Sequence, residues 1–97
     1  MKPSIALREH RDEVREVLDR FRMSNPRIFG SASRNEDTED SDLDILIEAP
    51  SETSLYDLAQ AELELEAILG CKVDLLTRGF LAPDVIDRVE GDLRPIP

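Results

Sequence analysis

Apolar positions recur at helical spacing in three parts of the chain. Residues 4–22 carry an apolar stripe flanked by many charged side chains, with Ser4 as the expected N-cap, and the Asn25-Pro26 pair ends this helix. Residues 54–69 form the second predicted helix, and Gly70 is placed to cap its C-terminus. Three glutamates of this helix are expected mostly to face solvent, and its predicted apolar positions are Leu55, Leu58, Ala59, Leu63, Ala67 and Ile68, with Leu65 and Leu69 filling in. Residues 80–89 form a last short helix.

Three other segments have the composition and alternation of β-strands. A short apolar run at Ile28 and Phe29 predicts the first strand. Leu43, Ile45 and Ile47 place one face of a second strand in the core. Residues 71–77 read as a third strand, and residues 94–97 as an extended segment along a sheet edge, where proline is tolerated.

The predicted order is helix, strand, strand, helix, strand, helix. This order predicts a small α/β fold with a mixed sheet and helices covering one face. At 97 residues the chain is expected to form a single domain, residues 1–97, with no room for a separate substrate-binding domain.

Two carboxylates lie at the head of the second strand. Asp42 and Asp44 point to the same side, opposite to the apolar set, because side chains alternate along a strand. Two like charges so close repel each other, and a cation between them removes that cost. Hard oxygen ligands of this kind favour magnesium.

A glycine-serine turn precedes this strand by ten residues. Gly30 permits a tight turn and a close approach of a ligand to the backbone. The backbone amides there and the Ser31 hydroxyl could hold a phosphate. A phosphate cradle beside paired metal-binding carboxylates indicates a nucleotide site.

The third strand adds a carboxylate with two interpretations. Asp74 lies within an apolar strand, where an unpaired charge is costly to bury. It either forms an ion pair with Lys72 or Arg78, or joins Asp42 and Asp44 on a neighbouring strand. From the residues alone both interpretations stay open; in the second, three carboxylates from two strands could hold two metal ions.

These residues resemble the signature of the polymerase-β-like nucleotidyltransferase superfamily. The chain reads Phe-Gly-Ser-Ala-Ser-Arg-Asn from Phe29 and Ser-Asp-Leu-Asp from Ser41, and it is most similar to the minimal nucleotidyltransferases. Members of the family often have alanine where this chain has Ser33 and glycine where it has Asn35. Asparagine tolerates the left-handed conformation better than most residues, so the turn should be preserved.

The resemblance implies an activity and a partner. Minimal nucleotidyltransferases are usually the antitoxins of HEPN-domain ribonuclease toxins, and the implied reaction transfers AMP from ATP to a hydroxyl of the toxin, expected to be a tyrosine. It implies catalytic and metal-binding roles for Asp42, Asp44 and Asp74, with two magnesium ions. The resemblance also implies that Gly30, Ser31 and Arg34 bind the nucleotide.

Charge and composition limit the partners further. The chain has 22 acidic and 12 basic side chains and a net charge of −10, which disfavours direct binding to nucleic acid and favours a basic protein partner in a hetero-oligomer. Residues 36–40 are acidic and are expected to form a solvated loop. The sequence has no apolar run long enough for a membrane span, and its charged first residues predict a cytoplasmic protein. The one cysteine, Cys71, is expected to pack rather than react.

Two alternatives to protein adenylylation stay open from the sequence. The chain could be a binding module that neutralises its partner by occlusion, with an idle site. It could also transfer a nucleotide to a small molecule such as an aminoglycoside, although the short chain argues against that acceptor.

Overall fold

A mixed sheet organises the fold, and its strand order brings the third strand next to the second. The structure, a computed structural model, describes residues 1–96, and of Phe80 only the backbone. The four strands are β1 (Ser24–Phe29), β2 (Leu43–Glu48), β3 (Val73–Leu76) and β4 (Arg94–Pro95), in the order β3-β2-β1-β4. β2 runs antiparallel to β1 and parallel to β3, and β4 runs antiparallel to β1, so the predicted α/β fold with a mixed sheet is confirmed.

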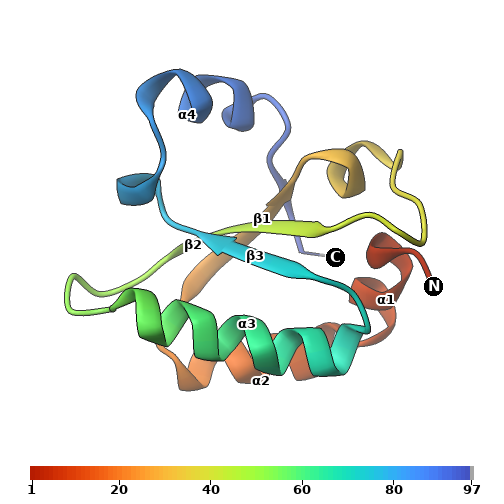
Figure 1. Ribbon diagram of the computed structural model, residues 1–97, viewed down its shortest axis with the longest axis horizontal. Helices are drawn as coiled ribbons and strands as arrows, with labels where there is room; N and C mark the ends of the chain where they lie inside the picture. The colour runs from red at the N-terminus through yellow and green to blue at the C-terminus, as the bar shows by residue number, and fades with distance from the viewer. Residues whose placement is uncertain (97) are drawn as a thin grey trace.

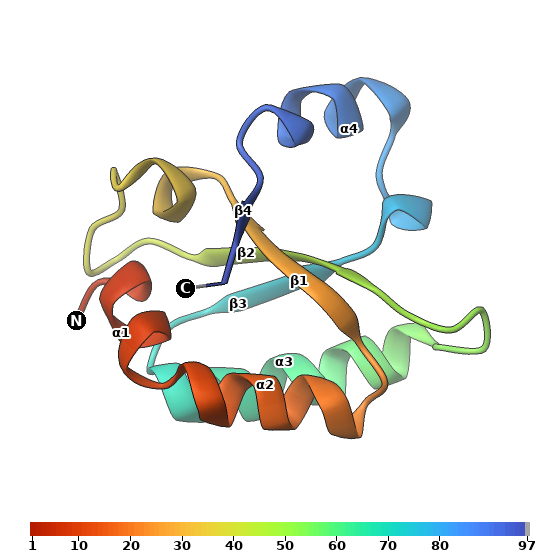
Figure 2. The same cartoon turned by 180° about the vertical axis from the view of Figure 1, so that it is seen from behind.

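The helices divide unequally between the two faces of the sheet. The helices α1 (Pro3–Glu9), α2 (Arg11–Arg20) and α3 (Leu55–Leu69) lie on one face (Figures 1 and 2). The short helix α4 (Pro83–Glu90) and the 3-10 turn η1 (Ser31–Arg34) lie on the other, and a second 3-10 turn, η2 (Arg78–Phe80), leads from β3 toward α4. The face opposite α1, α2 and α3 is therefore the one left accessible for a site.

The main core lies between the sheet and α1–α3. Leu43, Ile45 and Ile47 are buried, as the alternation along β2 predicts. They pack in one cluster with the buried side of α2 and with Leu58, Ala61, Leu65 and Leu69 of α3. Because the core fixes β2, the residues between its buried positions are fixed on the opposite face.

The first predicted helix is in fact two helices. α1 ends at Glu9 and α2 begins at Arg11, with His10 between them at φ −114° and ψ 22°. The prediction that Ser4 is the N-cap is wrong, because Lys2 occupies that position. The Nδ1 atom of His10 lies 2.9 Å from a carboxylate oxygen of Glu13, one turn later.

The acidic connection before β2 is not wholly solvated. Asp37 is only 3% exposed. Its carboxylate accepts hydrogen bonds from the backbone N–H of Ser4 at 2.8 Å and from the Ser4 hydroxyl at 3.0 Å. Asp37 therefore binds a free N–H group of the first turn of α1, and it holds the connection against the helix.

The bounds of α3 match the prediction, but its buried side matches only in part. Ser54 caps the helix in a capping box with Asp57, and Gly70 adopts the left-handed conformation after the last turn. The buried positions, however, are Leu58, Ala61, Leu65 and Leu69, whereas Leu55 and Leu63 are exposed.

Two of the glutamates that were predicted to face solvent bind β3. Glu66 accepts a hydrogen bond from the Val73 N–H at 3.0 Å, and Glu62 accepts one from the Leu75 N–H at 2.8 Å. β3 is an edge strand, and these carboxylates satisfy N–H groups that would otherwise be open to another strand.

The end of the described chain returns to the sheet. Arg94 and Pro95 pair with Ile28 and Arg27 of β1, as expected for an extended edge segment, and Ile96 is buried. Pro97, also assigned to this segment, lies outside the described residues. In the part of the chain that the structure describes, no helix is both long and apolar enough to cross a bilayer.

Candidate active site

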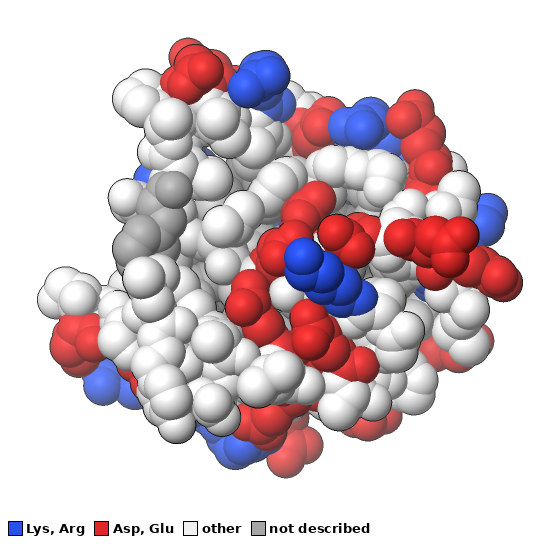
Figure 3. Space-filling view, viewed as in Figure 1, with Lys and Arg blue, Asp and Glu red and all other residues white. Residues whose placement is uncertain are grey.

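The sheet brings the predicted carboxylates together. Asp44 of β2 pairs in register with Asp74 of the parallel neighbour β3. Residues that pair across a sheet point to the same face, and neighbouring strands lie about 4.8 Å apart. Asp42 is exposed and lies just before β2. Figure 3 shows acidic side chains gathered around a basic one near the middle of the same view as Figure 1.

This arrangement disfavours the ionised form of Asp44. Burial, then the negative charges of Asp74 and Asp42, raise the pKa of Asp44 from 3.8 to about 6. The positive charge of Lys72 acts in the opposite direction and does not offset them. Asp44 is thus a half-buried carboxylate that a nearby cation would stabilise in its charged form.

Gly30 is required by the position of Asp44. Its φ of +74° lies in a region that favours glycine, and a Cβ at residue 30 would lie 2.9 Å from Oδ2 of Asp44. The missing side chain therefore lets the turn between β1 and η1 approach the carboxylate. Gly30 of the glycine-serine turn and Asp44 of the carboxylate pair therefore lie close together in the structure.

The two departures from the family pattern both fit the turn. The Ser33 hydroxyl donates a hydrogen bond to the Gly30 carbonyl at 2.7 Å. Asn35 follows η1 in the left-handed conformation, with φ 56° and ψ 31°, as expected for asparagine there. Ser31 is the first residue of η1, where backbone N–H groups have no partner within the helix, so the turn keeps donors for a phosphate.

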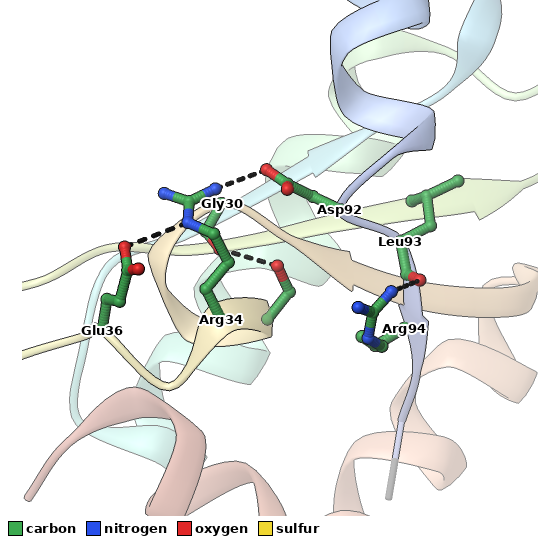
Figure 4. Close-up of polar contacts among 7 residues, drawn as sticks. Gly30, Arg34, Glu36, Asp92, Leu93 and Arg94 are labelled. Atoms are coloured by element: carbon green, nitrogen blue, oxygen red, sulfur yellow. Dashed lines mark hydrogen bonds and ion pairs between the residues drawn. The ribbon is translucent and has the colours of Figure 1, made fainter.

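Arg34 ends η1 and is held by two carboxylates. Its Nε donates to Glu36 at 3.1 Å, and its Nη1 pairs with Asp92, which follows α4 (Figure 4). Arg34 therefore bridges the turn to the segment after α4. A phosphate that binds Arg34 would compete with these two carboxylates.

A cavity opens beside Gly30 and Asp44. It measures about 240 Å³ and is lined by Phe29, Gly30, Asp44, Val85, Arg88, Val89 and Asp92. The sequence predicted only Gly30 and Asp44 of this set. Arg88 makes no ion pair within residues 1–96, which places an uncommitted cation at the cavity. The position of α4 determines which of its residues line the cavity, and no local motif in the sequence predicts that position.

A larger cavity lies at the other end of β2. It measures about 390 Å³, includes Ile47, Glu48 and the following loop, and has Glu48 and Arg78 as its charged residues. It contains none of the three aspartates. We therefore place the candidate site at the smaller cavity.

The donor set fits a hard divalent cation. Asp42, Asp44 and Asp74 supply only carboxylate oxygens, which suit magnesium, and burial together with the charges of Asp74 and Asp42 raises the pKa of Asp44 despite Lys72. Across the described residues, no group of three or more histidine, cysteine, aspartate or glutamate side chains is already gathered closely enough to hold a metal ion. Binding would thus require the carboxylates to rotate toward a shared ion.

Cys71 lies near the site but fits a packing role. The thiol is half-buried, and burial, then Glu66 and Asp42, raise its pKa. A raised pKa disfavours the reactive thiolate.

Comparisons with known proteins agree with the geometry. The nucleotidyltransferase domain family matches residues 7–95. A Methanocaldococcus jannaschii protein provisionally named a protein adenylyltransferase is 41% identical over 88 residues, covering 90% of this chain and 87% of that protein. The protein adenylyltransferase MntA of Thermococcus cleftensis is 39% identical over 83 residues, covering 86% and 81%.

Solved structures show the same architecture. A protein provisionally described as a minimal nucleotidyltransferase superposes with a TM-score of 0.80 at 36% identity, covering 97% of this chain and 94% of that one. A toxin–antitoxin structure with AMP-PNP has a TM-score of 0.77 at 18% identity, covering 89% and 71%, and shows likeness of fold alone. Fold, motif spacing and sequence identity agree, and the chain belongs to the nucleotidyltransferase domain family, as one of its minimal members.

Proposed function

We propose that this protein is an antitoxin that transfers AMP from ATP to a hydroxyl, expected to be a tyrosine, of a cognate HEPN-domain ribonuclease toxin. Residues 1–97 act as one catalytic unit in this proposal. The observation that carries it is the register that sets Asp74 beside Asp44, with Gly30 against the Asp44 carboxylate. The relatives named as protein adenylyltransferases and the toxin–antitoxin complex with AMP-PNP support the donor and the class of partner.

Each predicted residue has a role in this reaction. The hydroxyl oxygen of the acceptor attacks the α-phosphorus of ATP, and pyrophosphate leaves. Gly30, Ser31 and Arg34 bind phosphate oxygens. Arg34 breaks its ion pairs with Glu36 and Asp92 when it binds the phosphate. Asp74 accepts the proton of the attacking hydroxyl. Asp42, Asp44 and Asp74 would hold magnesium, which supplies charge neutralisation on the triphosphate and lowers the pKa of the hydroxyl.

Intact-mass spectrometry of the partner tests the reaction. Wild type, ATP and magnesium should add roughly 329 Da, one AMP, or a short run of such additions to the toxin. The double variant Asp42→Asn with Asp44→Asn should add none, because the carboxylates that would hold the charge-neutralising cation are lost. Both changes are nearly isosteric, so binding of the partner should persist.

A non-catalytic module that occludes the toxin is the alternative function. It predicts that the double variant still protects cells fully and that wild type never changes the mass of the toxin. Those two results together would exclude the enzymatic proposal.

Metal dependence has its own test. ATP should bind more tightly with magnesium than with a chelator, since the cation offsets repulsion between the triphosphate and the carboxylates. Titration calorimetry in the two buffers measures the difference. Equal affinities would contradict metal binding at Asp42, Asp44 and Asp74.

A further inference from the structure

The outer side of α3 carries a row of apolar side chains in water. Leu55, Tyr56 and Leu63 are 67%, 70% and 59% exposed. Ala59 and Ala67 are exposed as well, and the spacing of four residues from 55 to 67 aligns them along one side of the helix. We call Leu55, Tyr56, Ala59, Leu63 and Ala67 the outer stripe.

The outer stripe lies opposite the buried side of the same helix. Leu58, Ala61, Leu65 and Leu69 face the core, so α3 is apolar on two sides. A helix on the surface of a monomer normally has a polar outer side, whereas a helix that is apolar all round is usually covered. Contiguous exposed apolar patches mark interaction sites.

The charges around the outer stripe are acidic. α3 contains Asp57, Glu62, Glu64 and Glu66 and no basic residue. Arg20 of α2 pairs with Glu64 at 2.6 Å. Glu62 and Glu66 bind backbone N–H groups of β3, which are neutral donors, so their negative charges stay uncompensated.

These negative charges restrict which kind of partner can bind the outer stripe. A second copy docked through the same stripe would bring like charges together, which is unfavourable at an interface. Anionic lipid surfaces and nucleic acid carry the same sign of charge as the stripe's border. A protein segment with apolar side chains flanked by lysine or arginine complements both features.

We propose that the outer stripe is the docking surface for the acceptor protein, which presents an apolar helix bordered by basic residues. This inference rests on the proposed function, since it names the surface that the acceptor uses. Glu62 and Glu66 join α3 directly to β3, the strand that carries Asp74. In Figure 3, uncharged surface over α3 lies beside an acidic cluster on the same side of the molecule, and a partner on α3 would border the edge strand β3.

Two model peptides test the surface without any nucleotide. One is an amphipathic helix of leucine and lysine, and the other has glutamate at every lysine. Fluorescence anisotropy should show at least about tenfold tighter binding of the basic peptide, and Leu63→Glu should reduce that affinity at least about tenfold. Ile5→Glu, at a 39% exposed apolar position on α1, is the matched control and should bind as wild type does.

The same variants separate this inference from the proposed function. Asp42→Asn with Asp44→Asn should keep full peptide affinity while losing transfer, and Leu63→Glu should raise the KM for the toxin with kcat unchanged. If wild type transfers no AMP, the proposed function fails while the peptide result still decides the surface. Equal binding of the basic peptide by wild type and Leu63→Glu overturns the docking surface. Sedimentation of wild type as a dimer that Leu63→Glu dissociates would assign the stripe to a second copy instead.

Discussion

At the scale of single residues, Asp44 couples the site to pH. Its pKa is raised from 3.8 to about 6, so between these values the folded protein holds a proton that the unfolded chain has lost. The free energy of unfolding therefore falls as pH rises through this window, and the cost is fully present above about pH 6. Proton binding and cation binding are alternative ways to relieve the same repulsion.

This coupling gives a prediction for Asp44→Asn in metal-free buffer. The variant should gain melting temperature relative to wild type at about pH 7.5 and lose that advantage at about pH 4.5, because wild-type Asp44 is then largely protonated. Thermal denaturation of both proteins at both pH values measures the change. A constant difference between them would show that Asp44 contributes to folding in another way.

Gly30 and Gly70 form a matched pair for a second prediction. Both have positive φ, +74° and +72°, but only a Cβ at residue 30 meets Asp44, whereas residue 70 has open space. Gly30→Ala and Gly70→Ala should each lower stability by about 1–2 kcal/mol through backbone strain. The Asp44 side chain can rotate away from the new methyl group, so Gly30→Ala should also lose most transfer activity. Urea unfolding measures the loss of stability, and the mass assay measures the loss of transfer activity. Equal activity in both variants would show that the closeness of Gly30 to Asp44 does not matter for transfer.

At the scale of secondary structure, the edge of β3 depends on two side chains of α3. Glu62→Ala should cost about 1–3 kcal/mol, because it leaves the N–H of the buried Leu75 without its charged acceptor. Glu64→Ala is the control in the same helix and should cost less than about 1 kcal/mol, since it removes an exposed ion pair with Arg20. Denaturant titration compares them, and equal losses would show that the Glu62 bond to the strand contributes little.

The elements that local signals define were predictable. Ser54 and Gly70 mark the two ends of α3, the alternation along β2 indicates its buried side, and both predictions hold. The break at His10 has no proline or glycine to mark it. The orientation of α3 could not be predicted because the helix has apolar residues on two sides, and only packing against the sheet decides which side is buried.

Some features of the candidate site could likewise be predicted from the sequence, and others could not. The proximity of Asp44 to Asp74 follows from strand pairing of two short motifs, and the structure has that pairing. The bridge from Arg34 to Asp92 joins residues 58 apart, and the cavity depends on where α4 lies. The buried position of Asp37 was missed because its neighbours in sequence are acidic and exposed, while its partner Ser4 is 33 residues away.

At the scale of the whole molecule, the last described residues complete the core that the first helices begin. Ile96 is 4% exposed within the main hydrophobic cluster, and Arg15 of α2 donates to its carbonyl at 3.4 Å. Ile96→Ala should therefore cost about 2–5 kcal/mol, as expected for a truncated core side chain. Ile5→Ala, at a partly exposed position, should cost much less, and chemical denaturation would show the difference. Similar costs would mean that the C-terminal segment contributes little to folding.

The position of β4 beside β1 has a consequence for the growing chain. Strands β1, β2 and β3 can pair once residue 76 has left the ribosome, but the outer edge of β1 stays open until residues 94–96 emerge. Synthesis proceeds at about 5–20 residues per second, so this edge is available for about a second or more on every polysome. Neighbouring nascent chains carry the same open strand at high local concentration, and slow codons after residue 76 would prolong its exposure to strand exchange and co-translational aggregation.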